Sequence, residues 1–418
     1  MNIRKSMHAG IFTLVALIAL SGCVQGGNAG SGGLKGGPGV DTTAKTITLG
    51  ILSPETGPVA QPVGIPLENG VRAYFDQVND NGGIDGYKIN LVAKDSQYDP
   101  TQEVVGYNAI HNDVAMIADS LGTGTTFAIK DLSAQDQMLV TAATLSSALA
   151  REKYLILAGT PYRLQTENAF EYVSKQPGGA GAKVGIIYQD DEYGQDGLTG
   201  YKEAVSAYHL QDVGQAAVAA TATSFAAQVL QLKAAGAKYV FLTTLPQATA
   251  TIVGTGFALG YNPQWIMQSP AFSTLLLQSK VGPLFDHHVW LVSQGASWGD
   301  TSVPGMAPML AAVAKYYPQQ GPDGFFEFGY GISKVTAAII KKALDNKDVS
   351  RAGLLNAYNS IGDVDVGGLL PTLHYGTGGG TRVPSRDSII YIIDSSQPTS
   401  IKALSPDFVG TAAAASQF

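Results

Sequence analysis

The chain has 418 residues, of which 45% are hydrophobic and 14% are charged, against about 25% charged residues in an average soluble protein. At about 150 residues per domain, this length corresponds to two or three domains. The net charge of −7 argues against nucleic-acid binding, because affinity for phosphate backbones requires clustered positive charge. A single cysteine excludes a disulfide scaffold and a zinc site built from cysteines. The composition indicates a large, weakly charged globular protein.

Residues 1–22 are predicted to be a signal peptide for export. Arg4 and Lys5 precede an apolar run over Ile11–Leu20, which is too short to span a bilayer, since spanning takes about 20 residues. The following Leu20-Ser21-Gly22-Cys23 resembles the lipobox of bacterial lipoproteins. This resemblance implies that Cys23 is acylated on sulfur and becomes the mature N-terminus. We therefore expect an exported protein anchored to the outer face of the cell membrane, and an ordinary signal peptide that contains a cysteine is the alternative.

Residues 23–45 are predicted to form a lipidated flexible tether. The segment is rich in glycine and serine and shows no apolar periodicity. Such a composition is typical of a flexible coil, and about 20 residues of it have a root-mean-square reach of roughly 25 Å. We expect the folded body to begin at Thr46.

The first part of the body alternates short β-rich runs with segments of helical spacing. The expected strands are Thr46–Leu52, Ile89–Ala93, Val114–Ala118 and Met138–Ala143. The expected helices are Leu67–Val78, Thr101–Asn112 and Phe127–Asp136. A small-residue turn is expected at Gly122–Thr126.

The same alternation restarts after a gap. The expected strands are Lys183–Tyr188, Tyr239–Thr243, Trp265–Met267, Val289–Val292 and Ile389–Ile393. A turn at Asp190–Gly197 is expected to lead into a helix that ends near Tyr208, and the other expected helices are Phe225–Ala235, Thr249–Leu259, Met306–Tyr317 and Gly331–Leu344. Alternating strands and helices predict parallel sheets with right-handed crossovers. The predicted fold class is α/β with two doubly wound parallel-sheet lobes, which bind ligands at the carboxyl ends of their strands.

Searches for enzyme motifs find none. The chain has no G-x-x-x-x-G-K-[ST], no H-E-x-x-H and no G-x-S-x-G. His287-His288 is the one cluster of histidines and is predicted to lie in a surface turn. Asp190-Asp191-Glu192 lacks the alternation of a calcium loop. We therefore predict no catalytic residues, no metal, no cofactor and no enzymatic activity.

Two neighbouring strand ends carry hydroxyl groups. Gly122–Thr126 follows one predicted strand and precedes a helix, and Ala142-Ala143-Thr144 ends the next strand. Free N–H groups at a helix N-terminus and nearby hydroxyls favour a carboxylate or another anion. The alternative is that Thr125 or Thr126 caps its own helix.

The body also carries short motifs in a characteristic order. They are Ile51-Leu52 with Thr56-Gly57-Pro58-Val59-Ala60, Asn81-Gly82-Gly83-Ile84 with Gly86, Asp99-Pro100, the Ala142-Ala143-Thr144 strand end, and Asp190 to Gly194. With this order and spacing, Thr46 to Asp394 resembles the leucine/isoleucine/valine-binding type of periplasmic solute-binding protein, the receptor of an ABC importer. The resemblance implies a type I periplasmic binding fold, in which two lobes joined by a three-stranded hinge close over the ligand. The implied N-terminal lobe is 46–163 plus 296–380, and the implied C-terminal lobe is 164–295 plus 381–405.

The family's ligand residues match this chain unevenly. The resemblance places the carboxylate-binding hydroxyl at Thr123, the strand-end backbone and threonine at Ala142 and Thr144, and the tyrosine of the second lobe at Tyr193. An aromatic residue expected after the next second-lobe strand is replaced by Leu245. Around the first loop, Gln61 and Pro62 stand where an aromatic wall is common.

The acid that would pair with an amino-acid ammonium is replaced by Ser269. Because an unpaired charge in a closed cleft costs several kcal/mol, either Glu327 or Asp191 substitutes for it or the ligand is not an α-amino acid. Phe325, Phe326 and Phe328 fall near the family's apolar wall, and the alternative is that they belong to the core.

The resulting prediction is an extracytoplasmic solute-binding lipoprotein of an ABC importer. It is expected to act as a monomer with an ABC permease as partner. The expected solute is a small carboxylate-bearing molecule, either a branched-chain or other amino acid or a related apolar or aromatic acid. The first alternative is a ligand-sensing module of the same fold that signals rather than transports, and the second is an exported α/β enzyme.

Overall fold

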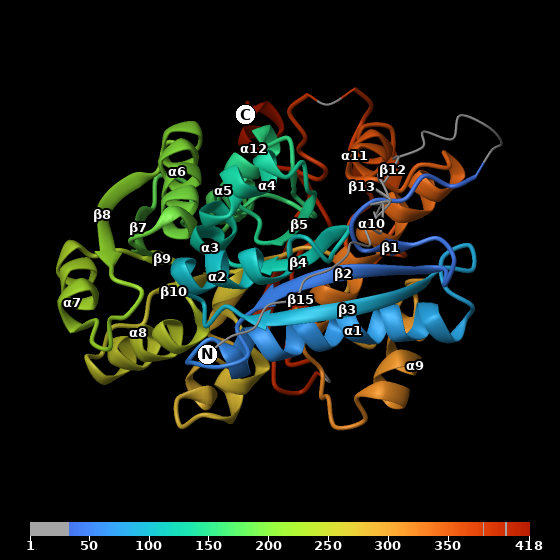
Figure 1. Cartoon of the computed structure of the whole chain (residues 1–418). Helices are drawn as coiled ribbons and strands as arrows, with labels where there is room; N and C mark the ends of the chain where they lie inside the picture. The colour runs from blue at the N-terminus through green and yellow to red at the C-terminus, as the bar shows by residue number, and fades with distance from the viewer. Residues whose placement is uncertain (1–32, 379, 398) are drawn as a thin grey trace, which may run out of the picture. The chain divides into compact units, whose positions relative to one another are not determined.

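The computed structural model describes residues 33–378, 380–397 and 399–418, which form two main β-sheets with helices packed on them (Figure 1). The predicted signal peptide, Cys23 and the first part of the predicted tether lie outside the described residues. In the part of the chain that the structure describes, no helix combines the length and the apolar character needed to cross a bilayer.

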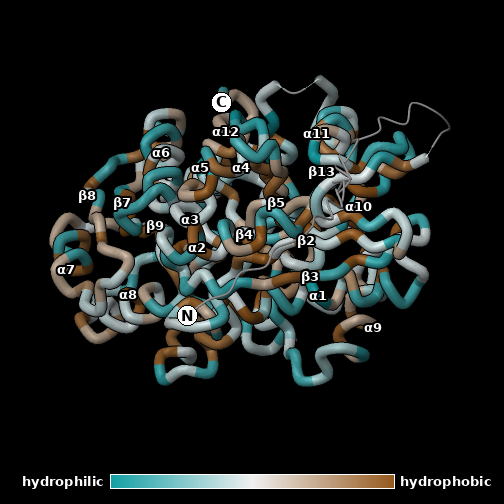
Figure 2. The backbone as a smooth tube through the Cα atoms, viewed as in Figure 1, coloured by the Kyte–Doolittle hydropathy of each residue, from teal (hydrophilic) through white to brown (hydrophobic). Residues whose placement is uncertain are grey.

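The first sheet contains six strands, and β3 pairs with β2 beside the path β1-β2-β4-β5-β6. Its strands are β1 (Val40–Asp41), β2 (Thr46–Ser53), β3 (Lys88–Asp95), β4 (Met116–Leu121), β5 (Val140–Ala143) and β6 (Leu155–Ile156). All pairs are parallel except β1 with β2. Figure 2 shows hydrophobic residues in central strands such as β4, in which every residue is buried.

Residues 34–45 do not form a free tether, because they pack onto this sheet. Strand β1 pairs with the start of β2, and the Lys35 backbone exchanges hydrogen bonds with Lys347 and Val349. Leu34 packs against the core beneath. The folded body therefore begins at Leu34, ahead of the expected start at Thr46.

Seven helices pack against the first sheet or against one another. They are α1 (Ile65–Asp80), α2 (Pro100–Ile110), α3 (Thr123–Ala128), α4 (Lys130–Gln135), α9 (Met306–Tyr316), α10 (Gly324–Asp345) and α11 (Arg351–Asn359). Helices α1 and α10 approach most closely at two glycines. A Cβ at Gly70 would overlap the carbonyl oxygen of Phe326, and a Cβ at Gly329 would overlap that of Leu67. This close contact fixes the first turns of α10 against α1.

The second sheet has seven strands in the order β15-β14-β11-β10-β9-β7-β8. They are β7 (Lys183–Gln189), β8 (Gln211–Val218), β9 (Tyr239–Thr243), β10 (Gln264–Gln268), β11 (Val289–Ser293), β14 (Ile389–Ile393) and β15 (Ile401–Ala403). Its helices are α5 (Tyr162–Ser174), α6 (Glu192–Ala207), α7 (Ala226–Ala235), α8 (Pro246–Ala258) and α12 (Thr411–Ala415). The sheet is mixed rather than wholly parallel, because β14 and β15 pair antiparallel. A small hairpin, β12 (Asp363–Val364) with β13 (Leu373–His374), stands apart.

Several predicted turn and helix boundaries differ from the structure, and three of the differences have a clear local cause. Gly122 has φ +105° and ends β4, so that α3 begins at Thr123 instead of after a turn. Asp191 accepts a hydrogen bond from the N–H of Gly194, which starts α6 at Glu192, inside the predicted turn. Asp323 caps α10, which therefore begins at Gly324 and not at Gly331.

The chain crosses between the two sheets three times, after β6, after β11 and before β14. Thr160 joins these crossovers. Its N–H donates to Gln294 Oε1 at 2.6 Å, and its hydroxyl pairs with Ser385 Oγ at 2.8 Å and donates to the Asp387 carbonyl at 2.7 Å. We propose that the two lobes divide at these crossovers, close to the boundaries 163/164, 295/296 and 380/381.

Candidate solute-binding site

A cavity of about 150 Å³ lies between the two sheets, beside the crossovers. A dry apolar cavity of similar size can hold a molecule as large as benzene. Its apolar and aromatic lining includes Leu67, Ala143, Leu145, Tyr162, Phe272, Leu291, Trp298, Phe325, Phe328, Leu369, Leu370, Tyr391 and Ile401. Its polar lining includes Ser269, Ser273, Thr274, Ser293, Gln294, Ser297, Asp323, Glu327 and Thr399. The cavity is a predominantly apolar space with a few hydroxyls and two acids.

The first turn of α10 supplies one wall. Asp323 Oδ1 accepts hydrogen bonds from the N–H groups of Phe325 at 2.8 Å and Phe326 at 3.1 Å, which fixes the start of the helix. Phe326 is fully buried and packs edge-on against Trp298. Phe325 and Phe328 line the cavity. The aromatic cluster is therefore divided between the wall and the core.

Glu327 is the more unusual of the two acids. The residue lines the cavity and is 5% exposed, and its Oε1 has no hydrogen-bond partner among the residues that the structure describes. Burial raises the pKa of Glu327 well above its ordinary value, and the negative charges of Asp300 and Asp323 add to this effect. Burial also raises the pKa of Asp323 to about 6, although two backbone N–H groups oppose the shift.

The two predicted threonines lie together, as expected for the ends of neighbouring parallel strands. Thr123 Oγ1 is 2.7 Å from Thr144 Oγ1, and Thr144 Oγ1 is 3.5 Å from the hydroxyl of Tyr162. The Tyr162 ring packs edge-on against Tyr193, with 4.9 Å between centroids. Thr123, Thr144, Tyr193 and the strand residue Ala142 are all buried and do not line the cavity. The structure therefore places this hydroxyl cluster next to Tyr162, behind the cavity wall.

The remaining predicted residues lie in different parts of the structure. Ser269 and Phe325 both line the cavity, and Ser269 Oγ donates to Gln165 Oε1 at 2.9 Å. Leu245 precedes α8 and packs against the core of the first sheet instead. Of the two acids considered as substitutes for the ammonium partner, Glu327 lines the cavity, whereas Asp191 caps α6.

An open groove of about 920 Å³ adjoins the cavity and shares Thr274, Pro322 and Asp323 with it. Gln61 lines this groove. Some of its wall residues lie beside the first sheet and others lie beside the second. The groove is therefore at the same junction as the cavity.

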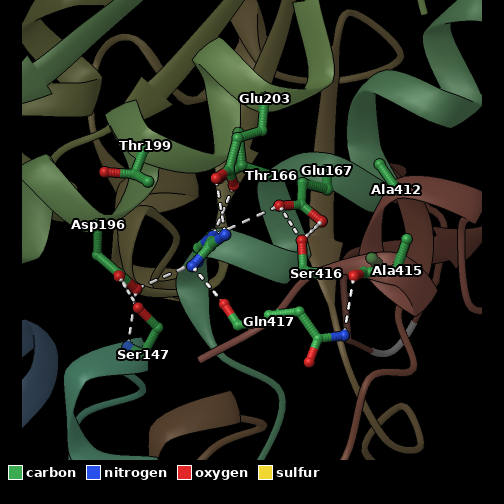
Figure 3. Close-up of polar contacts among 12 residues, drawn as sticks. Ser147, Thr166, Glu167, Asp196, Thr199, Glu203, Ala412, Ala415, Ser416 and Gln417 are labelled. Carbon is green, nitrogen blue, oxygen red and sulfur yellow. Dashed lines mark hydrogen bonds and ion pairs between the residues drawn. The ribbon is translucent and has the colours of Figure 1, made fainter. Parts of the chain in front are cut away.

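A polar network ties the first sheet to the helices of the second (Figure 3). Ser147, which follows β5, donates to the carboxylate of Asp196 on α6 through its hydroxyl and through its N–H at 3.0 Å. The N–H of Arg163 donates to the same carboxylate at 3.2 Å, and its guanidinium pairs with Glu203. Burial raises the pKa of Asp196 to about 6. Sequence analysis did not identify this network, because its members come from separated segments that share no motif.

One further group of side chains, one of them exposed and one buried, also has metal-ligand residue types. Oxygen and nitrogen atoms of Asp286, His287 and Asp394 lie within 4.8 Å of one another. His287 is exposed in a turn, as predicted, and the two carboxylates accept hydrogen bonds from Ser395 and Ser396. We assign no metal to this group.

Residues 46–398 match the family model described as periplasmic binding protein. The chain belongs to the periplasmic binding protein family. The resemblance inferred from the sequence is confirmed, and so is the fold class, with the mixed second sheet noted above. Since this is a family of binding proteins, membership supports the prediction that the chain is not an enzyme.

Several individual proteins are similar to this chain. Leu/Ile/Val-binding protein homolog 3 of Brucella melitensis is 28% identical over 200 residues, which cover 47% of this chain and 53% of that protein. The chain thus spans about half the length of this curated relative. The structure of a fatty acid ABC transporter substrate-binding protein from Thermomonospora curvata is 27% identical, with a TM-score of 0.85 over 92% of this chain and 97% of that one.

A branched-chain amino acid ABC transporter protein from Thermus thermophilus, with bound valine, has a TM-score of 0.76 at 18% identity. The match covers 88% of this chain and 97% of that chain. This likeness shows the shared fold.

Proposed function

We propose that this chain is the extracytoplasmic solute-binding component of an ABC importer. The observation that carries the proposal is the apolar cavity at the junction of the two sheets, beside the three crossovers. In folds of this kind, hinge motion about such crossovers opens and closes a site between lobes. Family membership supports an extracytoplasmic location, a permease as the partner and a small molecule as the ligand.

The proposed solute is an apolar molecule that bears a carboxylate. The lining explains the apolar part, because burying hydrocarbon against these side chains contributes about 25 cal/mol per Å². The names of the similar proteins refer to leucine, isoleucine and valine in one case and to a fatty acid in another. Both groups are apolar carboxylic acids, which is the class that we assign.

We retain all seven predicted positions as the proposed ligand site. Ser269 and Phe325 contact the solute directly from the cavity wall. Thr123, Thr144, Tyr193 and the strand-end backbone at Ala142 form the polar end, with Leu245 as an apolar contact. The solute reaches this end when the lobes open and close again. The support for this end is that Ala143, Leu145 and Tyr162, which adjoin these residues, line the cavity.

Native mass spectrometry of the protein purified without denaturation tests the proposal. The expected spectrum contains one apolar carboxylic acid bound per chain, and adding that acid back to stripped protein raises the melting temperature. Phe325→Ala reduces this increase, whereas Leu230→Ala, which alters an exposed side chain of α7, leaves it unchanged. No bound solute, together with no thermal shift across apolar amino acids, fatty acids and aromatic acids, would refute the proposal.

We further propose that Cys23 is lipidated and anchors a monomeric protein to the outer face of the membrane. In cells, the wild-type chain is then expected in the membrane fraction and Cys23→Ser in the soluble exported fraction. Mass spectrometry of the mature N-terminus detects the acyl groups. If both chains divide equally between the membrane and soluble fractions, Cys23 does not anchor the protein. Analytical ultracentrifugation of the exported Cys23→Ser chain tests whether the protein is a monomer.

A further inference from the structure

The cavity contains a carboxyl group without a partner. Glu327 lies on α10, lines the cavity and is 5% exposed, and no described residue forms a hydrogen bond with its Oε1. A buried polar group without a partner carries its full desolvation cost. A solute that fills the cavity is therefore able to supply the missing partner.

The surroundings of Glu327 oppose a negative charge on it. Besides burial, the nearby acids Asp300 and Asp323 disfavour its ionised form. None of the described residues that line the cavity is a lysine, an arginine or a histidine. Tyr391 approaches from the second sheet with its own proton retained, because burial raises its pKa, and its hydroxyl donates to the Gly295 carbonyl at 2.8 Å. A buried acid that has no positive partner remains in its neutral form.

A neutral carboxyl group differs from a carboxylate in what it recognises, because it is a hydrogen-bond donor. It offers no charge to a solute ammonium. A solute carboxylate beside it would meet the negative charge of Asp323, whose pKa of about 6 leaves it ionised at neutral pH. Asp323 is held there by the N–H groups of Phe325 and Phe326, which it accepts as helix cap. An uncharged oxygen accepts the proton of Glu327 without either conflict.

The lining strengthens this choice. Most of the cavity surface is apolar, and its aromatic members include Phe325, Phe328 and Trp298. Such a surface keeps water from competing for the carboxyl proton, so a hydrogen bond formed there is stronger than one in water. It also accommodates the hydrocarbon that carries the oxygen.

We propose that Glu327 is the specificity-determining residue of this cavity and, as an uncharged carboxyl, donates its O–H to an uncharged oxygen of the solute, that of a ketone, an amide or an alcohol. The proposal rests on the proposed function and narrows it. The carboxylate of the solute belongs to the polar end at Thr123 and Thr144, and the group beside Glu327 carries no charge. The assigned class is thus an apolar acid with a second, neutral oxygen function.

Three isosteric acids test this inference, because they differ only in one group on the fifth carbon. They are 5-oxohexanoate with a ketone oxygen, 5-methylhexanoate with a methyl group, and 5-aminohexanoate with an ammonium. We would titrate each into stripped protein by calorimetry at about pH 7.5, where the amine is protonated and the acid ionised. We expect the wild type to bind the ketone at least about tenfold more tightly than either of the other two.

Two substitutions separate an uncharged donor from a charged partner. Glu327→Gln keeps a neutral donor at nearly the same size, so the ratio between ketone and methyl affinities is expected to stay within about threefold of the wild-type ratio. Glu327→Leu has no donor, so the preference for the ketone is expected to disappear. Glu55→Gln, which removes an exposed carboxyl outside the cavity, is the control and is expected to change none of the affinities.

Infrared difference spectra read the protonation of Glu327 directly, since a protonated carboxyl has a carbonyl band that a carboxylate lacks. The wild type minus Glu327→Gln is expected to show this band, and 5-oxohexanoate is expected to shift it. Circular dichroism and melting temperature confirm that the variants fold. If Glu327→Leu does not fold, the wild-type order of affinities, Glu327→Gln and the infrared band still decide.

Tighter binding of 5-aminohexanoate, or equal binding of the methyl compound, would overturn the role of Glu327 and leave the proposed function intact, because an apolar acid would still bind. Loss of the ketone preference in a folded Glu327→Gln, its retention in a folded Glu327→Leu, or absence of the infrared band would overturn it as well. Binding of none of the three, nor of 4-acetylbenzoate, 4-isopropylbenzoate and 4-(1-aminoethyl)benzoate, would also overturn the inference, and the solute found by native mass spectrometry would then decide the proposed function separately.

Discussion

The hydroxyl oxygens of Thr123 and Thr144 lie 2.7 Å apart and satisfy each other. Thr123 begins the helix after β4, and Thr144 directly follows β5, the parallel neighbour of β4. Both residues are nearly inaccessible, at 2% and 1% exposure. A solute that uses these hydroxyls must therefore exchange this bond for bonds of its own.

Valine substitutions separate the structural from the binding role of this pair. A single Thr123→Val or Thr144→Val is expected to destabilise the protein by about 1–3 kcal/mol, because it removes the short hydrogen bond of the buried hydroxyl that remains. The double variant is expected to lose less unfolding free energy than the two single variants lose together, because neither hydroxyl is left unpaired in it. Urea denaturation measures the four free energies of unfolding.

The same double variant is expected to bind the solute at least about tenfold more weakly. Loss of one buried hydrogen bond to the solute, worth about 1.4 kcal/mol, corresponds to a tenfold change in affinity. Unchanged affinity in a folded double variant would show that the polar end of the site lies elsewhere.

The buried carboxyl group of Glu103 is expected to make the stability of the protein depend on pH. The residue is buried on α2, Ser120 Oγ donates to its Oε1 at 2.6 Å, and its Oε2 has no partner among the described residues. Burial raises the pKa of Glu103 from 4.5 to about 8. The folded protein therefore retains a proton that the unfolded chain releases above its lower pKa. This contribution to stability is fully present below pH 4.5 and is lost as the pH rises to about 8.

Glu103→Gln removes this titration and keeps the size of the side chain. Relative to the wild type, the variant is expected to gain stability progressively as the pH rises from about 5 to 8. Chemical denaturation at several pH values measures the difference, with Glu55→Gln as an exposed control. Parallel curves for Glu103→Gln and the wild type would contradict the prediction.

Gln294 connects the crossovers to the cavity. It accepts a hydrogen bond from the buried N–H of Thr160 and also lines the cavity. Gln294→Met removes the acceptor at similar volume, and we expect a loss of about 1–3 kcal/mol in unfolding free energy together with weaker solute binding. Gln231→Met, on the exposed face of α7, is the matched control for denaturation and titration. Wild-type stability and affinity in Gln294→Met would show that this bond does not support the hinge.

Ser416 secures the C-terminal segment to α5. Its hydroxyl lies 2.7 and 2.8 Å from the two carboxylate oxygens of the fully buried Glu167, to which Arg163 also comes within 3.6 Å (Figure 3). Ser416→Ala removes a donor to a buried carboxyl, so we expect a loss of about 1–3 kcal/mol in thermal or urea unfolding. A loss below about 0.5 kcal/mol, the usual range of surface substitutions, would indicate that Arg163 alone satisfies Glu167.

Most of the central strands were predictable because buried parallel strands are continuous apolar runs. Tyr239–Thr243 was predicted with the bounds that the structure shows for β9, which pairs parallel on both sides. Strand β8 was missed because Gln211–Val218 is a half-exposed edge strand without a clear alternation. Helix α5 was missed because polar residues such as Thr166, Glu167 and Asn168 are buried in it, which removes the apolar stripe that signals a helix.

The site was predictable only where neighbouring strand ends determine it. Thr123 and Thr144 follow adjacent strands, so their proximity could be expected. The division between Phe325 in the wall and Phe326 in the core depends on where α10 starts, which the Asp323 cap sets. Trp298 and Tyr391 reach the cavity from distant segments, and no local pattern marks them.

A crystal structure of the protein with the solute that co-purifies with it tests the central claim most directly. The claim predicts that the solute occupies the cavity between the sheets, in contact with Phe325 and Ser269. A solute bound on another surface, with this cavity filled only by protein side chains, would contradict the claim.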